Sequence, residues 1–126
     1  MTLFSSHRGT CQVLHLSGRD WELLLGPENA GTHHATLGFS TFPAGSHPAG
    51  HTHPLEEELI YVVSGHGQLV TGDQVIDLSP GTAVYIHPGV EHATVAGPDS
   101  MLELVTVFAP PVVPGSYEPA GPEATE

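Results

Sequence analysis

Positive charge is almost missing from this sequence of 126 residues. Two arginines, Arg8 and Arg19, stand against 14 carboxylates, so the formal net charge is −12 with neutral histidines. A field of this sign repels phosphate backbones and anionic membranes, and we expect neither nucleic acid nor a membrane as partner. Without lysine there is no Schiff-base chemistry, and no arginine after Arg19 offers a phosphate clamp. Any cation in a site built from the later residues must therefore be imported.

Cysteine and long apolar runs are also scarce. The single Cys11 cannot form an internal disulfide, and the first residues lack an apolar core of signal-peptide length, so we expect a reduced, cytoplasmic setting. No run approaches the roughly 20 apolar residues that cross a bilayer. With 39% hydrophobic residues, the length suits one domain with its own core.

Short apolar runs alternate with turns rich in glycine and proline, and no segment has the pattern of a long amphipathic helix. Many short strands at close spacing predict an all-β sandwich or barrel. GQLV-TGDQ-VIDL predicts a β-hairpin. The predicted strands are Cys11–Leu16, Trp21–Leu25, Ala35–Phe42, Gly50–His53, Glu58–Val63, Gly67–Thr71, Val75–Leu78, Ala83–Ile86, His92–Val95 and Met101–Phe108.

The stretch GSHPAGHTHPLEEELIYVVSG gathers three histidines and three glutamates before an apolar run. Side chains two apart on a strand share a face, so His51 and His53 are expected to point the same way. Glu58 heads a strand with two apolar faces, and a buried carboxylate must be paired, neutralised or bound to a metal. His92 leaves a tight turn after another strand as a fourth possible ligand. Glu56 and Glu57 are expected to lie on a solvated edge.

The spacing resembles the two cupin motifs. The first has Gly45, five residues, His51-Thr-His53, four residues, Glu58, six residues and Gly65; the second has Gly81, five residues, His87-Pro-Gly89, two residues and His92. The resemblance covers roughly residues 37–108. It implies a small cupin-type β-barrel (a jelly-roll-like double-stranded β-helix) over residues 1–108, with motif one at 45–65 and motif two at 81–96. The Pro-rich residues 109–126 are expected to form an extended or disordered tail.

The resemblance also implies a metal site. In cupins the residues at the positions of His51, His53, Glu58 and His92 bind one divalent metal. Imidazoles with one carboxylate suit Fe, Mn, Ni, Co, Cu or Zn better than Ca or Mg, and the set does not select among them. His87 stands where the family usually has proline, and Ala96 stands where asparagine often follows; neither change removes a ligand.

These residues favour a small substrate that reaches the metal through oxygen, such as an enol, diketone, phenol, hydroxy-ketone or small carboxylate. A dioxygenase-type oxidoreductase is the first hypothesis. The alternatives are a non-redox isomerase, cyclase, decarboxylase or lyase, and a metal or small-ligand binding protein without turnover. His87, Tyr61 or Tyr85 is the candidate that moves a proton. The apolar residues expected to line the pocket are Ile60, Val62, Phe39, Tyr85 and Met101.

Apolar side chains remain once such a pocket is filled. Leu59, Tyr61 and Val63 form a second face beside Glu58, and large apolar patches do not usually stay wet. Packing of a second copy against this sheet predicts a homodimer. Alternatively, the N-terminal strands or the tail cover the patch within one chain.

Overall fold

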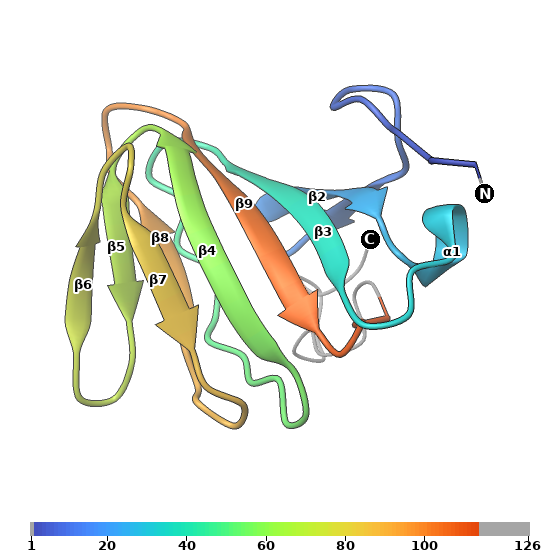
Figure 1. Ribbon diagram of the computed structural model, residues 1–126. Coiled ribbons are helices and arrows are strands. Elements are labelled where there is room, and N and C mark those ends of the chain that lie inside the picture. Colours follow the sequence, from blue (N-terminus) through green and yellow to red (C-terminus); the bar gives the residue numbers. More distant parts are fainter. Residues whose placement is uncertain (1, 114–126) are drawn as a thin grey trace.

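The computed structural model describes residues 2–113, and almost all of its regular structure is strand. All paired strands in this part of the chain are antiparallel (Figure 1). A six-stranded sheet has the order β1-β2-β3-β9-β4-β7, and a three-stranded sheet has the order β6-β5-β8. The elements are β1 (Val13–Leu16), β2 (Arg19–Leu25), α1 (Pro27–Ala30), β3 (Thr36–Phe42), β4 (Glu57–Ser64), β5 (Gly67–Val70), β6 (Val75–Leu78), β7 (Ala83–Ile86), β8 (Ala93–Ala96) and β9 (Leu102–Ala109).

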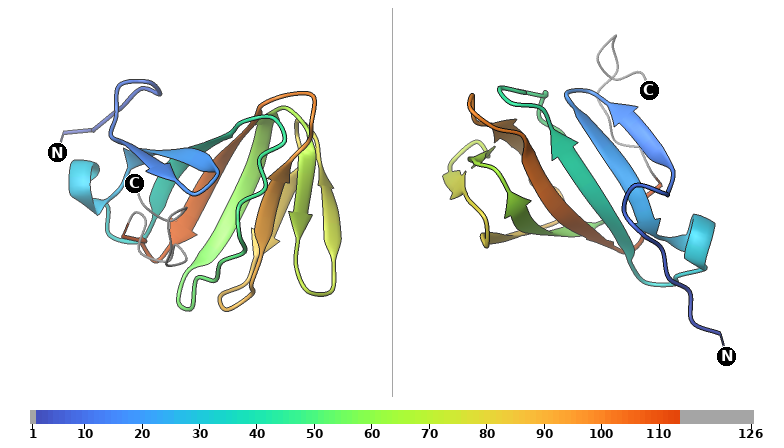
Figure 2. Two further views of the ribbon diagram at one scale, coloured as in Figure 1. Left: turned by 180° about the vertical axis from the view of Figure 1, so that it is seen from behind. Right: turned by 90° about the horizontal axis from the view of Figure 1, so that it is seen from above.

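The two sheets face each other as the walls of a small barrel, which the two views of Figure 2 show from behind and from above. Burial alternates along β9 and β4, so every second side chain points between the sheets. The main core there joins Ile60 and Leu104 of the large sheet to Leu69 and Leu78 of the small one. The all-β architecture predicted from the alternating apolar runs is therefore confirmed.

A second core lies under the β1–β2 hairpin. Trp21 and Leu23 pack there with Phe108 and Val112, and the Trp21 indole donates a hydrogen bond from Nε1 to Thr106 Oγ1 at 3.2 Å. The burial of Val112 means that the segment expected to be a tail begins as part of this core. Residues 114–126 of the expected tail lie outside the described residues.

Two local expectations were wrong. Gly50–His53 forms no strand; only His51 pairs, in an isolated antiparallel bridge to His92, because prolines 48 and 54 flank the segment and withhold ladder donors. The short helix α1 was not expected. It begins with Pro27 at a position where no donor is needed, and Gly31 ends it in the left-handed region with φ 68°. Among residues 2–113, no helix has the length and apolarity to cross a membrane.

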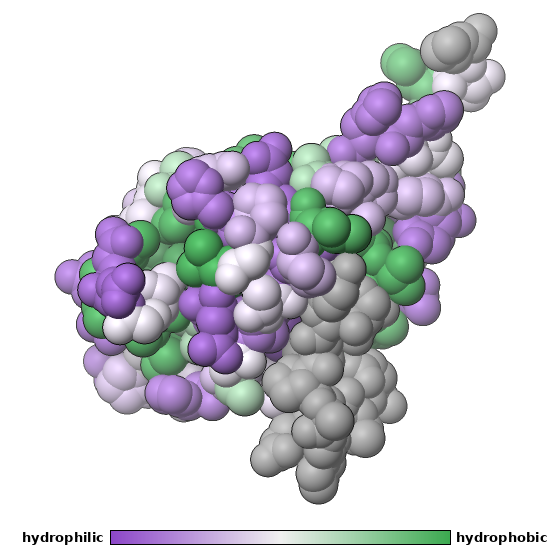
Figure 3. Space-filling view, turned by 90° about the horizontal axis from the view of Figure 1, so that it is seen from below, coloured by the Kyte–Doolittle hydropathy of each residue, from purple (hydrophilic) through white to green (hydrophobic). Residues whose placement is uncertain are grey.

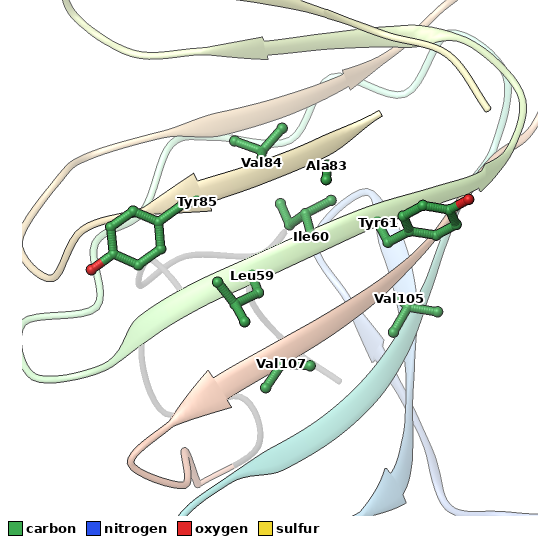
Figure 4. Close-up of a pocket in the computed structure, with 8 residues that line it drawn as sticks. All are labelled: Leu59, Ile60, Tyr61, Ala83, Val84, Tyr85, Val105 and Val107. Atoms are coloured by element: carbon green, nitrogen blue, oxygen red, sulfur yellow. The ribbon is translucent and has the colours of Figure 1, made fainter. Parts of the chain in front are cut away.

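The outer face of the large sheet is apolar but only partly covered. Arg8 of the N-terminal segment lies 3.9 Å above the Phe39 ring and forms a 2.8 Å ion pair with Glu103, so the chain itself covers the side near β3. Toward β4 and β7, Leu59 and Tyr61 stay about half exposed. Figure 4 shows them beside side chains of the neighbouring strands β7 and β9, namely Tyr85, Val105 and Val107. The homodimer stays a prediction, with this uncovered part as its contact.

Replacing Gly38 with alanine should destabilise the second core. A Cβ at this position would overlap the Trp21 ring, which is also held by its bond to Thr106. We expect Gly38→Ala to lower the free energy of unfolding by about 1–3 kcal/mol, measured by urea unfolding followed through Trp21 fluorescence. Gly72→Ala is the matched control, since nothing lies within 4 Å of its Cβ position. Equal stability of the two variants would mean that the indole does not fill the space above Gly38.

The oligomeric state can be tested at the outer face. The formal charge of −12 opposes contact between copies where carboxylates meet, so a self-contact is favoured at a face whose centre is apolar. Light scattering at micromolar concentration should give twice the mass of one chain for the wild type. The Leu59→Glu variant should give the mass of one chain. Leu55→Glu, which changes an exposed residue outside the sheet, should leave the dimer intact. A monomeric wild-type protein contradicts the prediction.

Candidate metal centre

Four side chains converge at the end of the barrel where β4 begins and β9 ends. One ligand atom from each of His51, His53, Glu58 and His92 lies within 4.8 Å of the others. Glu58 points inward from β4, which lies between β9 and β7, so its backbone is fixed on both sides. His51 and His92 are held together by two backbone hydrogen bonds, of 2.9 and 3.0 Å. The structure thus brings together all four residues that the motif spacing indicated.

His53 is fixed by its backbone and by an aromatic neighbour. Its carbonyl accepts a 2.8 Å hydrogen bond from the Gly89 amide, which ties the His53 loop to the turn before His92. Its ring packs against Phe108, with 4.9 Å between ring centroids. Phe108 belongs to the second core, so the apolar packing under the β1–β2 hairpin forms one wall of the cluster.

The orientation of His92 is set by a backbone contact. Its Nδ1 lies 3.0 Å from the Val90 carbonyl oxygen, and because a carbonyl only accepts, Nδ1 carries a hydrogen. The other ring nitrogen, Nε2, therefore faces the cluster and lies 3.2 Å from Glu58 Oε1. A backbone carbonyl that fixes the tautomer in this way is the usual support of a metal-binding histidine.

Burial controls the charge of the imidazoles. Burial first, and then the neighbouring charges of His92, Arg19 and His53, together lower the pKa of His51 to about 2, so His51 is neutral near pH 7. Burial also lowers the pKa of His53, although the carboxylates of Glu58 and Glu56 oppose this. For His92, burial is the largest influence and lowers the pKa, but the contact with Glu58, the charge of Glu58 and the Val90 carbonyl together outweigh burial, and the net pKa is raised. The cluster is thus two neutral imidazoles beside a histidine–carboxylate pair.

These donors fit a divalent transition metal. The Nδ1 atom of His51 is buried and makes no hydrogen bond within residues 2–113, so this ring nitrogen has no partner there that a metal would have to replace. Glu58 Oε1 lies 3.2 Å from His92 Nε2 and 3.8 Å from His53 Nε2, which directs one carboxylate oxygen at both rings. Imidazole nitrogens with one carboxylate are a donor set of Fe, Mn, Co, Ni, Cu and Zn.

Glu56 was wrongly expected on a solvated edge. Only 5% of this residue is exposed, because it shares the inward face of the chain with Glu58 and Ile60. Its carboxylate raises the pKa of His53, which places it beside the cluster. The two-residue alternation that selected Glu58 also selects Glu56, so the sequence held the signal that would have found it.

The three candidate proton donors are not brought to the cluster. Tyr61 and Tyr85 lie on the outer face and are about half exposed, since they alternate with the inward Ile60 and Val84. The Tyr85 hydroxyl donates a 2.8 Å hydrogen bond to Glu57, which raises the pKa of the phenol. His87 is exposed at the rim and packs edge-on against Tyr85, with 4.6 Å between ring centroids.

The expected pocket lining is only partly on the inner face. Ile60 and Val62 are buried between the sheets as expected. Phe39 instead lies beneath Arg8 on the outer face, and half of Met101 is exposed in the connection before β9. The end of the barrel seen in Figure 3 is mostly hydrophilic, with separate apolar residues between the polar ones.

Comparison with known proteins agrees with this fold. A polyketide cyclase, RemF from Streptomyces resistomycificus, superimposes with a TM-score of 0.78 at 20% identity, over 97% of this chain and 89% of the cyclase. Ectoine synthase from P. lautus superimposes with a TM-score of 0.76 at 18% identity, over 88% of this chain and 80% of the synthase. A predicted oxalate decarboxylase from Thermotoga maritima superimposes with a TM-score of 0.74 at 18% identity, over 84% of this chain and 98% of the decarboxylase. No curated protein sequence matches significantly.

The sequence pattern of the cupin domain matches residues 38–108, which contain all four residues of the cluster. This match spans more than half of the chain, and solved structures that share the fold cover most of the remainder. The chain belongs to the cupin domain family.

Proposed function

We propose that this protein is a metal-dependent enzyme that acts on a small, oxygen-chelating organic molecule by non-redox chemistry. The reaction classes are isomerisation, cyclisation, decarboxylation and elimination. The observation that carries the proposal is the convergence of three imidazoles and one carboxylate within 4.8 Å in a largely buried site. Such a set holds a cation strongly while leaving coordination positions for a substrate.

The four residues of the cluster would hold the metal, and each has a definite part. A bound divalent ion would act as a Lewis acid toward a substrate oxygen and stabilise negative charge that develops on it. Val90 keeps the hydrogen on Nδ1 of His92, so that Nε2 faces inward. Phe108 restricts the His53 ring and excludes water from that side. Glu56 adds a second carboxylate beside His53 and makes that imidazole more basic.

Non-redox chemistry is favoured by the names of proteins that share the fold. The three structures compared above are named as a cyclase, a synthase and a predicted decarboxylase. A dioxygenase-type oxidoreductase remains the second candidate, because histidine and carboxylate ligands with open positions also suit Fe(II). Binding of a metal or small ligand without turnover is the third.

The ligand assignment predicts a sharp contrast between adjacent glutamates. Glu58→Gln should weaken metal binding by about 100-fold or more, as should His51→Ala, His53→Ala and His92→Ala, since even residues that only support ligands affect affinity by about 10- to 100-fold. Metal content is measured by elemental analysis after purification, and affinity by competition with a chelator.

Glu57→Gln is the matched control. This residue lies next to Glu58, but its side chain bonds Tyr85 on the outer face, so metal content should not change. If Glu57→Gln lost the metal and Glu58→Gln kept it, the assignment of inward and outward faces on β4 would be wrong. Unchanged stoichiometry in any histidine variant would remove that residue from the site.

The reaction class is tested by assay with and without oxygen. The purified protein is loaded separately with Fe(II), Mn(II), Co(II), Ni(II) and Zn(II), and incubated with enols, diketones, phenols, hydroxy-ketones and small carboxylates. We expect turnover to persist in the absence of oxygen and to disappear in the Glu58→Gln variant. Oxygen uptake coupled to product would favour the dioxygenase instead, and saturable ligand binding without product would favour a binding protein.

A further inference from the structure

Arg19 lies on the inner face of the β1–β2 hairpin. It precedes Trp21 by two residues on β2, and Trp21 points inward to Thr106, so the alternation of the strand places Arg19 on the same face. Leu16, its cross-strand partner, packs against the second core, which confirms the direction of this face. Arg19 is therefore on the side of the sheet on which the metal cluster lies.

The turn that carries Arg19 is fixed against the segment that leads to the first ligand. Ser46 donates its hydroxyl hydrogen to the Gly18 carbonyl, and a Cβ on Gly18 would lie 3.0 Å from Pro48 Cβ. Pro48 is buried three residues before His51. One guanidinium nitrogen of Arg19 donates to the Ser17 carbonyl at 3.1 Å, which holds the side chain across the turn. The hairpin and the ligand segment thus form one unit.

The inner face of this hairpin reaches the cluster. Phe108 packs with Trp21, two residues from Arg19, and also against the His53 ring, so Arg19 lies on the strand face that borders the cluster. The other arginine, Arg8, lies on the opposite face of the sheet, above Phe39 and paired with Glu103. The sequence places no fixed positive charge after Arg19, but the hairpin brings Arg19 itself to the side of the sheet on which the cluster lies.

We propose that Arg19 anchors a carboxylate of the substrate while an oxygen at the other end of the same molecule binds at the metal cluster. This inference rests on the proposed function and narrows its substrate class to small anionic chelators. A guanidinium matches a carboxylate with two parallel hydrogen bonds. One arginine at the site of a chain with net charge −12 suits a monoanionic carboxylate better than a phosphate dianion. The same negative field makes a local cation necessary if an anion is to enter at all.

The test uses the Co(II)-loaded protein, whose visible spectrum reports chelation at the cluster. Two matched pairs of ligands share a chelating 2-oxo acid and differ in a distal carboxylate: 2-oxoglutarate with 2-oxopentanoate, and 2-oxoadipate with 2-oxohexanoate. For at least one pair, we expect the ligand with the distal carboxylate to bind about 10- to 100-fold more tightly, the range of a charged hydrogen-bonded contact. Arg19→Gln should abolish this preference, while the affinity for the ligand that lacks the distal carboxylate should stay unchanged.

Two further variants separate charge at the site from charge in general. Arg8→Gln removes the same charge from the outer face and should keep the preference, and Arg19→Lys should retain part of it. Stoichiometric cobalt binding by each variant shows that the barrel is folded. If the wild type binds neither distal carboxylate more tightly, or if the preference survives in Arg19→Gln, then Arg19 does not anchor the substrate. Neither result contradicts the proposed function. Failure of the wild type to bind cobalt overturns the proposed function itself.

Discussion

A buried carboxylate among imidazoles is the constraint on which the rest of this structure depends. Glu58 is 5% exposed on the inner face of β4, and a charge in that position needs partners close by. His92 and His53 approach the same carboxylate oxygen, but burial lowers the pKa of His51 and His53 and limits the positive charge that the imidazoles can carry. A divalent cation satisfies both demands, because it balances the carboxylates and uses neutral nitrogen lone pairs. The position of β4 between two other strands and the paired backbone of His51 and His92 hold the donors in place for it.

The barrel separates apolar packing from this polar cluster. The main core fills the space between the sheets beyond Ile60, whereas Phe108, Trp21 and their neighbours close the side toward the β1–β2 hairpin. Phe108 belongs to both regions, since it packs in the second core and against the His53 ring. The hairpin therefore helps to position the cluster through Phe108, and a change that loosens the second core also loosens the packing of the His53 ring.

Residues close together in sequence were predictable, and residues brought together by packing were not. The four residues of the cluster follow from the resemblance to two short motifs, even though a bridge to His92 holds His51 and a bond from Gly89 holds His53, in place of the expected strand. Glu56 could have been found, because it shares the alternation of Glu58. The outward direction of Tyr61 and Tyr85 was ambiguous because both faces of β4 and β7 carry apolar residues, and only the packing of the small sheet decides which face is inside. Nothing in the local sequence of Arg19 indicates that a hairpin turn carries it toward residues more than thirty positions later.

Neighbouring side chains of β4 serve the two opposite faces of the large sheet. Glu58 points to the cluster, while its neighbours Glu57 and Leu59 lie toward the outer face, where Glu57 accepts a bond from Tyr85 and Leu59 contributes to the uncovered apolar area. A strand cannot shift one face without the other, because a displacement along its register moves every side chain on both. Contacts that Glu57 and Leu59 make on the outer face thus also restrain the position of the Glu58 carboxylate on the inner face. The precision with which four donor atoms meet within 4.8 Å is therefore a property of both surfaces of the sheet, and not of the residues around the cluster alone.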